Sequence, residues 1–349
     1  MTAVEVPDSL DELLTPAWLD GALSARFPGV HVTTVTRGPV VERLSTNARF
    51  HIDCAPPVPP GLSLDLCVKG YFSEHGRSMG YAGEPEAMFY RDLRDHIGAR
   101  TLCSVWADVH PATRNGVVIT EDVIAAGGVF LDALSPYSVE QVASTLEELA
   151  RLHAFAWEHP ERASASWLTP RLARTMEARG LPEIQRNFDG PTGVGVPPEI
   201  REPQLVMDAV RALAARKPGP GWTVIHGDAH VGNIFLDVGG RPGLLDWQLV
   251  QHGHWGIDVS YQVASSLDPA VRVHAERDLL VHYLDRLRGE GVDAPPFDVA
   301  WLEYRRGVAY GFYLWAITLY VQPDIIAALL HRLGSAAVDL ESYAALQDL

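Results

Sequence analysis

Hydrophobic and polar residues alternate along several short segments in the first third of the chain, as they do in strands with one buried face. The pattern predicts strands over residues 33–36, 44–52, 62–69 and 117–123, and the Arg-Gly-Pro sequence at residues 37–39 is expected to end the first of them. We therefore predict a small antiparallel sheet in this part of the chain.

The pattern changes after the last of these strands, where long Ala-, Leu- and Arg-rich stretches favour helices. We predict two lobes, residues 1–124 and residues 125–349, and the chain is long enough for two modest cores. The longest apolar run, residues 307–321, is shorter than the roughly 20 residues of a membrane-spanning helix and predicts a buried helix. Aromatic residues of the second lobe are expected to serve core packing more than a ligand pocket: Trp255, Tyr304, Tyr310, Tyr313, Trp315 and Tyr320.

A strand-loop-strand pattern in the second lobe carries the clearest chemistry. A β-branched run at residues 223–225 precedes a tight polar loop with Asp228 and Asn233, and a second short strand delivers Asp246 at its end. In phosphoryl transfer one acid orients the hydroxyl that is phosphorylated, while an amide oxygen and a second carboxylate hold Mg²⁺ against the nucleotide phosphates. The spacing of these three residues therefore indicates kinase chemistry.

A kinase also needs a lysine for the nucleotide phosphates and an acid that holds this lysine. Lys69 ends an apolar strand in a chain where lysine is sparse. Glu86 lies on a predicted helical stripe with Phe89, after Pro85, which suits a first helical turn. We predict that Glu86 is the acidic partner of Lys69, and Glu84 is the competing candidate.

The expected phosphate-covering loop lies between the first two predicted strands and ends in Ser45, Thr46 and Asn47. Backbone amides and hydroxyl groups in such a hairpin can contact phosphates. Protein kinases carry several glycines in this loop, whereas here only Gly38 is present. The loop by itself does not indicate nucleotide binding.

The sequence HGDAHVGN at residues 226–233, followed by DWQ at residues 246–248, resembles the aminoglycoside phosphotransferase and choline kinase superfamily. It is most similar to the ecdysteroid-kinase-like branch. The resemblance implies an α+β, bilobal, protein-kinase-like fold, with a small antiparallel-sheet N-terminal lobe and a larger, mainly helical C-terminal lobe. It implies that Asp228 is the catalytic base, that Asn233 and Asp246 bind magnesium, and that Asp258 supports the loop.

The same resemblance implies that ATP and Mg²⁺ are the cofactors and that the acceptor is a small hydroxylated metabolite or drug. It also implies a hinge at Glu121 and Val123, whose backbone binds adenine. His226 is expected to be structural. The sequence does not say which acceptor is used or which oligomer forms.

A zinc site is one alternative, because His226 and His230 flank Asp228 and two more histidines follow. A zinc site leaves Asn233 and the DWQ sequence without a role, and we expect His252 and His254 to lie at the surface or in a loop. A purely structural polar loop is a second alternative.

Two further alternatives concern the function of the whole chain. A kinase-fold protein that binds a nucleotide or ligand without phosphoryl transfer is compatible with the glycine-poor loop. A protein kinase is disfavoured, because DWQ stands where DFG is expected.

Net charge and cysteine content restrict which partners and which cellular location we expect. The net charge of -16 disfavours nonspecific binding to nucleic acid, because phosphates are repelled. Cys54, Cys67 and Cys103 are few and unpatterned, which predicts reduced thiols and a cytoplasmic location. The first residues are acidic and interrupted by proline, unlike a secretion leader, and we expect no membrane association.

Overall fold

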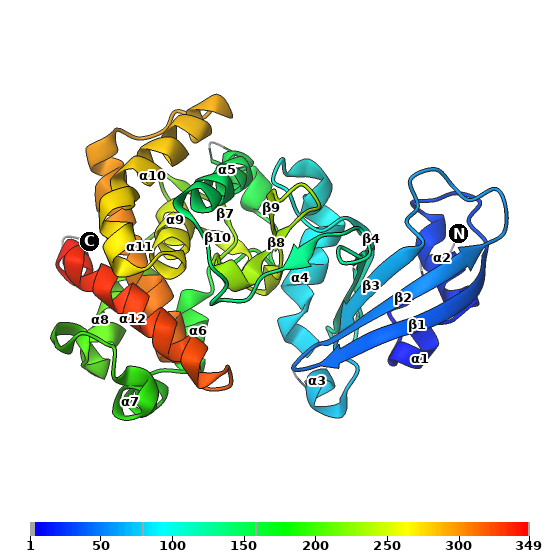
Figure 1. Ribbon diagram of the computed structural model, residues 1–349, viewed down its shortest axis with the longest axis horizontal. Helices are drawn as coiled ribbons and strands as arrows, with labels where there is room; N and C mark the ends of the chain where they lie inside the picture. Colours follow the sequence, from blue (N-terminus) through cyan, green and yellow to red (C-terminus); the bar gives the residue numbers. More distant parts are fainter. Residues whose placement is uncertain (1–3, 79, 158, 348–349) are drawn as a thin grey trace.

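The computed structural model describes residues 4–78, 80–157 and 159–347. Figure 1 shows a lobe built on a sheet beside a larger lobe built mainly of helices, as predicted. The helices are α1 (Leu10–Leu13), α2 (Pro16–Ser24), α3 (Glu74–Ser78), α4 (Glu84–Met88), α5 (Val139–Ala154), α6 (Leu172–Ala178), α7 (Leu181–Asp189), α8 (Pro203–Ala214), α9 (Trp255–Ser266), α10 (Pro269–Gly289), α11 (Phe297–Ala316), α12 (Pro323–Asp339) and α13 (Ser342–Ala345).

The N-terminal lobe contains an antiparallel sheet with the strand order β1-β2-β3-β5-β4. Its strands are β1 (Val32–Glu42), β2 (Thr46–Cys54), β3 (Asp65–Gly70), β4 (Ser104–Val109) and β5 (Gly116–Glu121). Buried side chains of α1 and α2 form one core with the apolar residues of β2 and β3, such as Phe50 and Val68. The predicted antiparallel sheet is confirmed.

The first strand is longer than we predicted. Residues 37–39 do not end β1, which continues to Glu42 with a shift in register between Arg37 and Val40. Proline is tolerated here because β1 is an edge strand, whose outward N–H groups need no partner in the sheet. A side chain at Gly38 would lie 2.9 Å from the backbone oxygen of Arg49, so the close approach of β1 to β2 requires glycine.

The second lobe holds two small sheets beneath its helices. Strand β7 (Trp222–Ile225) pairs with β10 (Gln251–His254), and β8 (Ile234–Leu236) pairs with β6 (Val129–Phe130) and β9 (Pro242–Leu244). Helices α9 and α11 pack against each other in the centre of this lobe. The predicted core aromatic residues are buried, with the exception of Tyr320, which is 87% exposed: Trp255, Tyr304, Tyr310, Tyr313 and Trp315.

Helix α4 packs on strands β4 and β5 of the sheet, and its apolar residues also join the core of the helical lobe. The turns after α4 bury Phe89, Tyr90 and Leu93 together with apolar residues of α5 and α9. The ring of Phe89 stacks on that of Trp247 with centroids 3.6 Å apart. The chain passes from β5 to β6 through residues 122–128, and a division of the lobes after residue 124 stays a prediction.

Two structural findings concern the cysteines and the length of the apolar helices. Cys54, Cys67 and Cys103 are all free thiols, as predicted. Among residues 4–78, 80–157 and 159–347, no helix is both long enough and apolar enough to cross a membrane.

His254 is buried, so the expectation that it lies at the surface or in a loop is wrong. It ends β10 and caps α9: its Nδ1 accepts a hydrogen bond of 3.1 Å from the Gly256 N–H, and its Nε2 lies 3.4 Å from Glu303. Because Nδ1 is an acceptor, the ring is neutral. Burial lowers the pKa of His254 to about 3, although Glu303 opposes this shift.

This burial predicts a loss of stability in acid. Between pH of about 6.5 and 3 the unfolded chain binds a proton at His254 that the folded chain does not bind, so the free energy of unfolding falls as the pH falls. The contribution is at most about 1.4 kcal/mol for each pH unit. Urea unfolding at pH 7, 6 and 5 should give a shallower pH dependence for His254→Asn. The exposed control His96→Gln should keep the wild-type slope, and equal slopes in all three proteins would contradict the prediction.

Candidate active site

The loop between β7 and β8 is held from below by Asp258 of α9. The buried carboxylate of Asp258 accepts hydrogen bonds from the backbone N–H groups of His226, at 2.6 Å, and Gly227, at 2.9 Å. His153 of α5 lies 3.1 Å from the same carboxylate. Gly227 has φ of 79°, and a side chain there would lie 2.3 Å from the Leu249 oxygen. Asp258 therefore fixes a turn that only glycine can make.

The ring of His226 joins this loop to the next one. Its Nδ1 accepts a hydrogen bond from the Asp228 N–H at 3.2 Å, and its Nε2 donates to the Leu245 oxygen at 2.9 Å. Both ring nitrogens are therefore used inside the protein, and the acceptor role of Nδ1 defines a neutral ring. The His226 ring therefore links Leu245, the residue before Asp246, to the backbone of Asp228.

Asp228 and Asn233 lie next to each other with a defined orientation. The Asn233 Nδ2 atom donates to the backbone oxygen of Asp228 at 2.9 Å and to its Oδ2 at 3.0 Å. Both partners can only accept, so the nitrogen assignment is unambiguous and the Asn233 Oδ1 atom stays available as an acceptor. The Asp228 side chain is 27% exposed. This carboxylate is accessible yet held in place.

Lys69, Glu86 and Asp246 form a cluster that joins the two lobes. The Lys69 Nζ atom lies 2.6 Å from Glu86 of α4 and 3.1 Å from Asp246. Burial alone lowers the pKa of Lys69, but Asp246 and Glu86 outweigh it and hold this pKa above its usual value. Burial raises the pKa of Asp246, yet Lys69 outweighs it and the net shift is downward. Lys69 and Asp246 thus form a charged pair.

Glu84, the competing candidate, points elsewhere. Arg114 donates to its carboxylate from Nε at 3.0 Å. The side chain of Glu86, in contrast, is buried beside Lys69, and burial raises its pKa above the usual value although Lys69 opposes this shift. The structure therefore brings Glu86, and not Glu84, to the lysine.

Two residues after Asp246 complete the junction between the lobes. Trp247 is fully buried between the rings of Phe89, 3.6 Å away, and His226, 4.6 Å away. The Gln248 Nε2 atom donates to the hydroxyl of Tyr71 at 2.8 Å. Asp246 itself has left-handed backbone angles, φ of 63° and ψ of 71°. The DWQ sequence thus places an acid at the site and anchors both lobes beside it.

The predicted phosphate loop lies beside Lys69 in the sheet. Thr46 begins β2 and is buried opposite Gly70, while Asn47 pairs with Lys69. The Asn47 Nδ2 atom donates to the Ser45 hydroxyl at 3.4 Å. The hairpin is therefore close to the lysine, but the hydroxyl of Thr46 is less accessible than that of Ser45.

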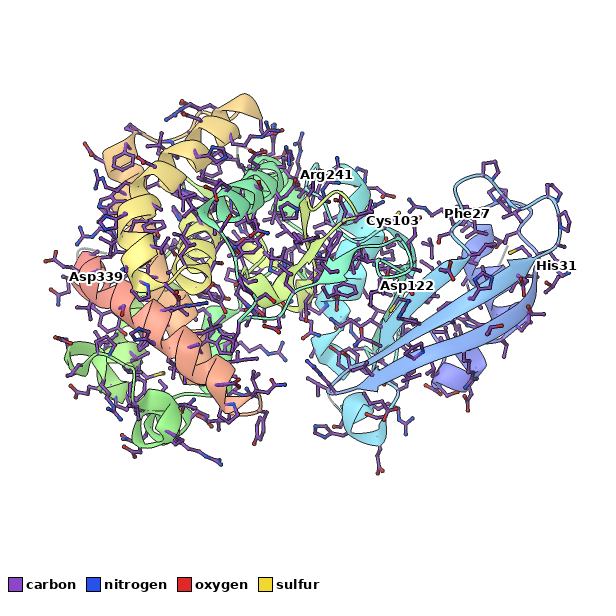
Figure 2. All side chains as sticks on the ribbon, viewed as in Figure 1. Phe27, His31, Cys103, Asp122, Arg241 and Asp339 are labelled. Atoms are coloured by element: carbon purple, nitrogen blue, oxygen red, sulfur yellow. The ribbon has the colours of Figure 1, made fainter. Side chains whose placement is uncertain are left out.

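The predicted hinge follows β5. Glu121 is its last residue, and the backbone oxygen of Val123 accepts a hydrogen bond of 2.8 Å from Gly128. Between them, the Asp122 carboxylate accepts a hydrogen bond of 2.9 Å from the Ile124 N–H and forms an ion pair with Arg49. Figure 2 shows Asp122 against the sheet of the N-terminal lobe. This segment is the connection between the lobes.

The oxygen donors of Asn233 and Asp246 fit a hard divalent cation. The Leu245 N–H donates to the backbone oxygen of Asn233 at 3.1 Å, which brings the segments that carry Asn233 and Asp246 together. A free amide oxygen and a carboxylate are donors that Mg²⁺ prefers. The zinc alternative has no support, since His226 uses both nitrogens internally. In the described part of the chain, moreover, no group of three or more His, Cys, Asp and Glu residues is arranged for a metal.

Comparison with known structures gives the same fold. The GDP complex of wild-type aminoglycoside 2'-phosphotransferase-IIIa matches with a TM-score of 0.51 and 12% identity, over 93% of this chain and 99% of that chain. A putative aminoglycoside phosphotransferase from Ralstonia eutropha matches with a TM-score of 0.52 and 13% identity, over 94% and 97%. A choline/ethanolamine kinase family protein from Mesorhizobium loti has a TM-score of 0.48 and 15% identity, over 89% and 93%.

Comparison with sequences identifies the family. No curated protein matches the chain in sequence. The model of the phosphotransferase enzyme family matches residues 82–295, more than half of the chain, including Glu86 and the loops that carry Asp228, Asn233 and Asp246. The ecdysteroid-kinase-like branch stays a prediction. The chain belongs to the phosphotransferase enzyme family.

Proposed function

We propose that the protein is an ATP- and Mg²⁺-dependent phosphotransferase that moves the γ-phosphate to a hydroxyl group of a small molecule. The observation that carries the proposal is the convergence of Asp228, Asn233, Asp246 and Lys69 at the junction of the lobes. Phosphoryl transfer depends mainly on positioning and charge neutralisation, and these four side chains offer both. The GDP complex of a structurally similar aminoglycoside phosphotransferase supports a nucleotide site.

Each side chain has a distinct role in this proposal. The partly accessible carboxylate of Asp228 accepts or orients the proton of the acceptor hydroxyl, as a positioned general base does. Lys69, held by Glu86, binds the nucleotide phosphates. The free oxygen of Asn233 and the carboxylate of Asp246 would hold Mg²⁺, which neutralises phosphate charge when bound.

The hinge and the β1–β2 hairpin would supply the remaining contacts to the nucleotide. The backbone of Glu121 and Val123 would bind the base, beside the connection of the lobes. Ser45, Thr46 and Asn47 would cover the phosphates from the hairpin that pairs with Lys69. In this proposal residues 1–124 bind the nucleotide, and residues 125–349 bind the acceptor and catalyse transfer.

A nucleotide-binding protein without transfer is the second candidate. One observation favours it: the turn of the β1–β2 hairpin, Arg43 to Ser45, contains no glycine, and Gly38 lies within the β1 strand. Bound phosphates would therefore be covered by a hairpin with less backbone freedom than a glycine-rich loop.

The release of ADP from Mg-ATP separates these functions. The acceptor panel should contain hydroxylated metabolites, aminoglycosides, macrolides and steroids, and Asp228→Ala should be measured beside the wild type. Release that depends on an acceptor and disappears in the variant supports the transferase. Magnesium-dependent ATP binding without release for any acceptor favours the binding protein.

Lys69 is expected to govern nucleotide affinity. Lys69→Met should raise the KM for ATP by about 10- to 100-fold, because a charged group loses its hydrogen bonds to phosphate. Glu86→Gln should have a smaller effect, because Asp246 still holds the lysine. The effects of the two changes should not add, since the residues are in contact. The chain's other lysine is exposed, so Lys217→Met is the matched control and should leave the KM unchanged.

A further inference from the structure

A buried tyrosine contacts the proposed catalytic base directly. Tyr261 lies in α9 and has no exposed surface. Its hydroxyl donates to the Asp228 Oδ1 atom at 3.1 Å, opposite the bond that Asn233 makes to Oδ2. Trp315, on α11, donates from its indole Nε1 to the same tyrosine hydroxyl at 2.6 Å. Three side chains therefore form a chain that ends on the base.

The direction of this chain follows from the chemistry of its members. The indole N–H can only donate, so the hydroxyl oxygen of Tyr261 accepts in that bond. Its single O–H proton is then left for Asp228, whose carboxylate can only accept. Burial raises the pKa of Tyr261 well above its usual value, so this hydroxyl keeps its proton. The order Trp315 to Tyr261 to Asp228 is the arrangement that satisfies every donor.

The neighbouring His230 does not compete with this series of hydrogen bonds. The ring of His230 lies edge-on against Trp315, 5.4 Å away, and its Nε2 atom is 3.9 Å from Asp228. Its Nδ1 accepts the Gly232 N–H at 3.1 Å, and burial lowers its pKa despite the attraction of Asp228. His230 is therefore neutral and does not compete with Tyr261 for the carboxylate as a charged donor.

We propose that Tyr261 and Trp315 are positioning residues that orient the Asp228 carboxylate toward the acceptor hydroxyl. This inference rests on the proposed phosphotransferase function. With Asn233 on one oxygen and Tyr261 on the other, the plane of the carboxylate is fixed while its side chain stays partly exposed. Tyr261 and Trp315 act through Asp228, so they should affect turnover and not nucleotide binding.

The kinetic test compares variants that remove one hydrogen-bonding group each. Tyr261→Phe should lower kcat by about 10- to 100-fold, because misplaced catalytic groups are costly, while the KM for ATP and its magnesium dependence stay unchanged. Trp315→Phe should lower kcat less. The double variant should be no slower than Tyr261→Phe, because the tryptophan acts only through the tyrosine hydroxyl.

A matched control distinguishes positioning from packing. Tyr304 lies on α11, is fully buried, and donates its hydroxyl to Glu276 at 3.3 Å. Tyr304→Phe should keep the wild-type kcat even if the melting temperature falls. A Tyr261→Phe enzyme with wild-type kcat overturns the inference while leaving the proposed function intact, as does a loss of kcat that adds fully to that of Trp315→Phe.

A second measurement does not depend on the acceptor. The Trp315 indole N–H signal, assigned by its loss in Trp315→Phe, should move upfield in the proton NMR spectrum of Tyr261→Phe. An unmoved signal overturns the hydrogen-bond chain. If the wild type releases no ADP with any acceptor, the proposed function fails, and the positioning role fails with it, whatever the NMR spectrum shows.

Discussion

Asp246→Ala should abolish the effect of Mg²⁺ on nucleotide affinity, whereas Asp228→Ala should bind Mg-ATP normally and lose turnover by about 10²- to 10⁴-fold. The reason is their different surroundings. Asp246 contacts Lys69 and follows Leu245, whose N–H donates to the backbone oxygen of Asn233, whereas the Asp228 carboxylate is partly accessible. Calorimetric titration of ATP with and without Mg²⁺ measures the first effect, and ADP release at saturating substrates measures the second.

The two variants control each other in this experiment. Each replaces one aspartate by alanine within the same pair of loops, so a general disturbance of folding would affect both measurements in both proteins. Asp293→Ala, at an exposed position before α11, is the reference for a lost surface carboxylate. Nucleotide affinity that is insensitive to Mg²⁺ in the wild type and in Asp246→Ala alike would refute the assignment of Asp246.

Trp247→Ala should lower the free energy of unfolding by about 3–5 kcal/mol, the usual cost of deleting a large buried aromatic side chain. The indole is fully buried between Phe89, which follows α4, and His226, which supports the loop of Asp228 and Asn233. Its loss leaves a cavity where the two lobes meet. Urea unfolding at pH 7 gives this free energy, and the midpoint should shift without a matching change in slope.

The same change should also weaken nucleotide binding. Trp247 packs on the segment that carries Glu86, so a cavity there frees the acid that holds Lys69. Trp247→Phe retains a ring against Phe89 and should recover most of the stability and affinity. If the free energy of unfolding of Trp247→Ala stayed within about 1 kcal/mol of the wild-type value, close to the range of surface changes, this contact would not contribute to holding the lobes together.

Local patterns in the sequence determined the parts of the site that lie within one short segment. Asp228 and Asn233 are five residues apart in one tight loop, so their contact depends on local turn geometry. The alternating residues of β3 likewise place Lys69 on the face opposite to buried Val68, and this follows from the two-residue period of a strand. The antiparallel sheet and the helical second lobe follow from the same periodicities.

Where local preferences left a choice, the tertiary structure decided. The Pro39 segment was expected to end a strand, and only the edge position of β1 lets the strand continue. Glu84 and Glu86 both suit a first helical turn, and the packing of α4 on Trp247 turns Glu86 to the lysine. His254 looks polar in sequence, yet its cap on α9 buries it.

The residues around Asp228 show most clearly what depends on local sequence and what depends on tertiary packing. Tyr261 and Trp315 are 54 residues apart and lie on two helices whose aromatic residues predict core packing. Their hydrogen bonds to each other and to Asp228 exist because α9 and α11 pack side by side beneath the loop. The sequence by itself determined which chemical groups each segment carries; only the packing of distant segments decided which groups meet, because contact between them depends on the whole core and not on spacing along the chain.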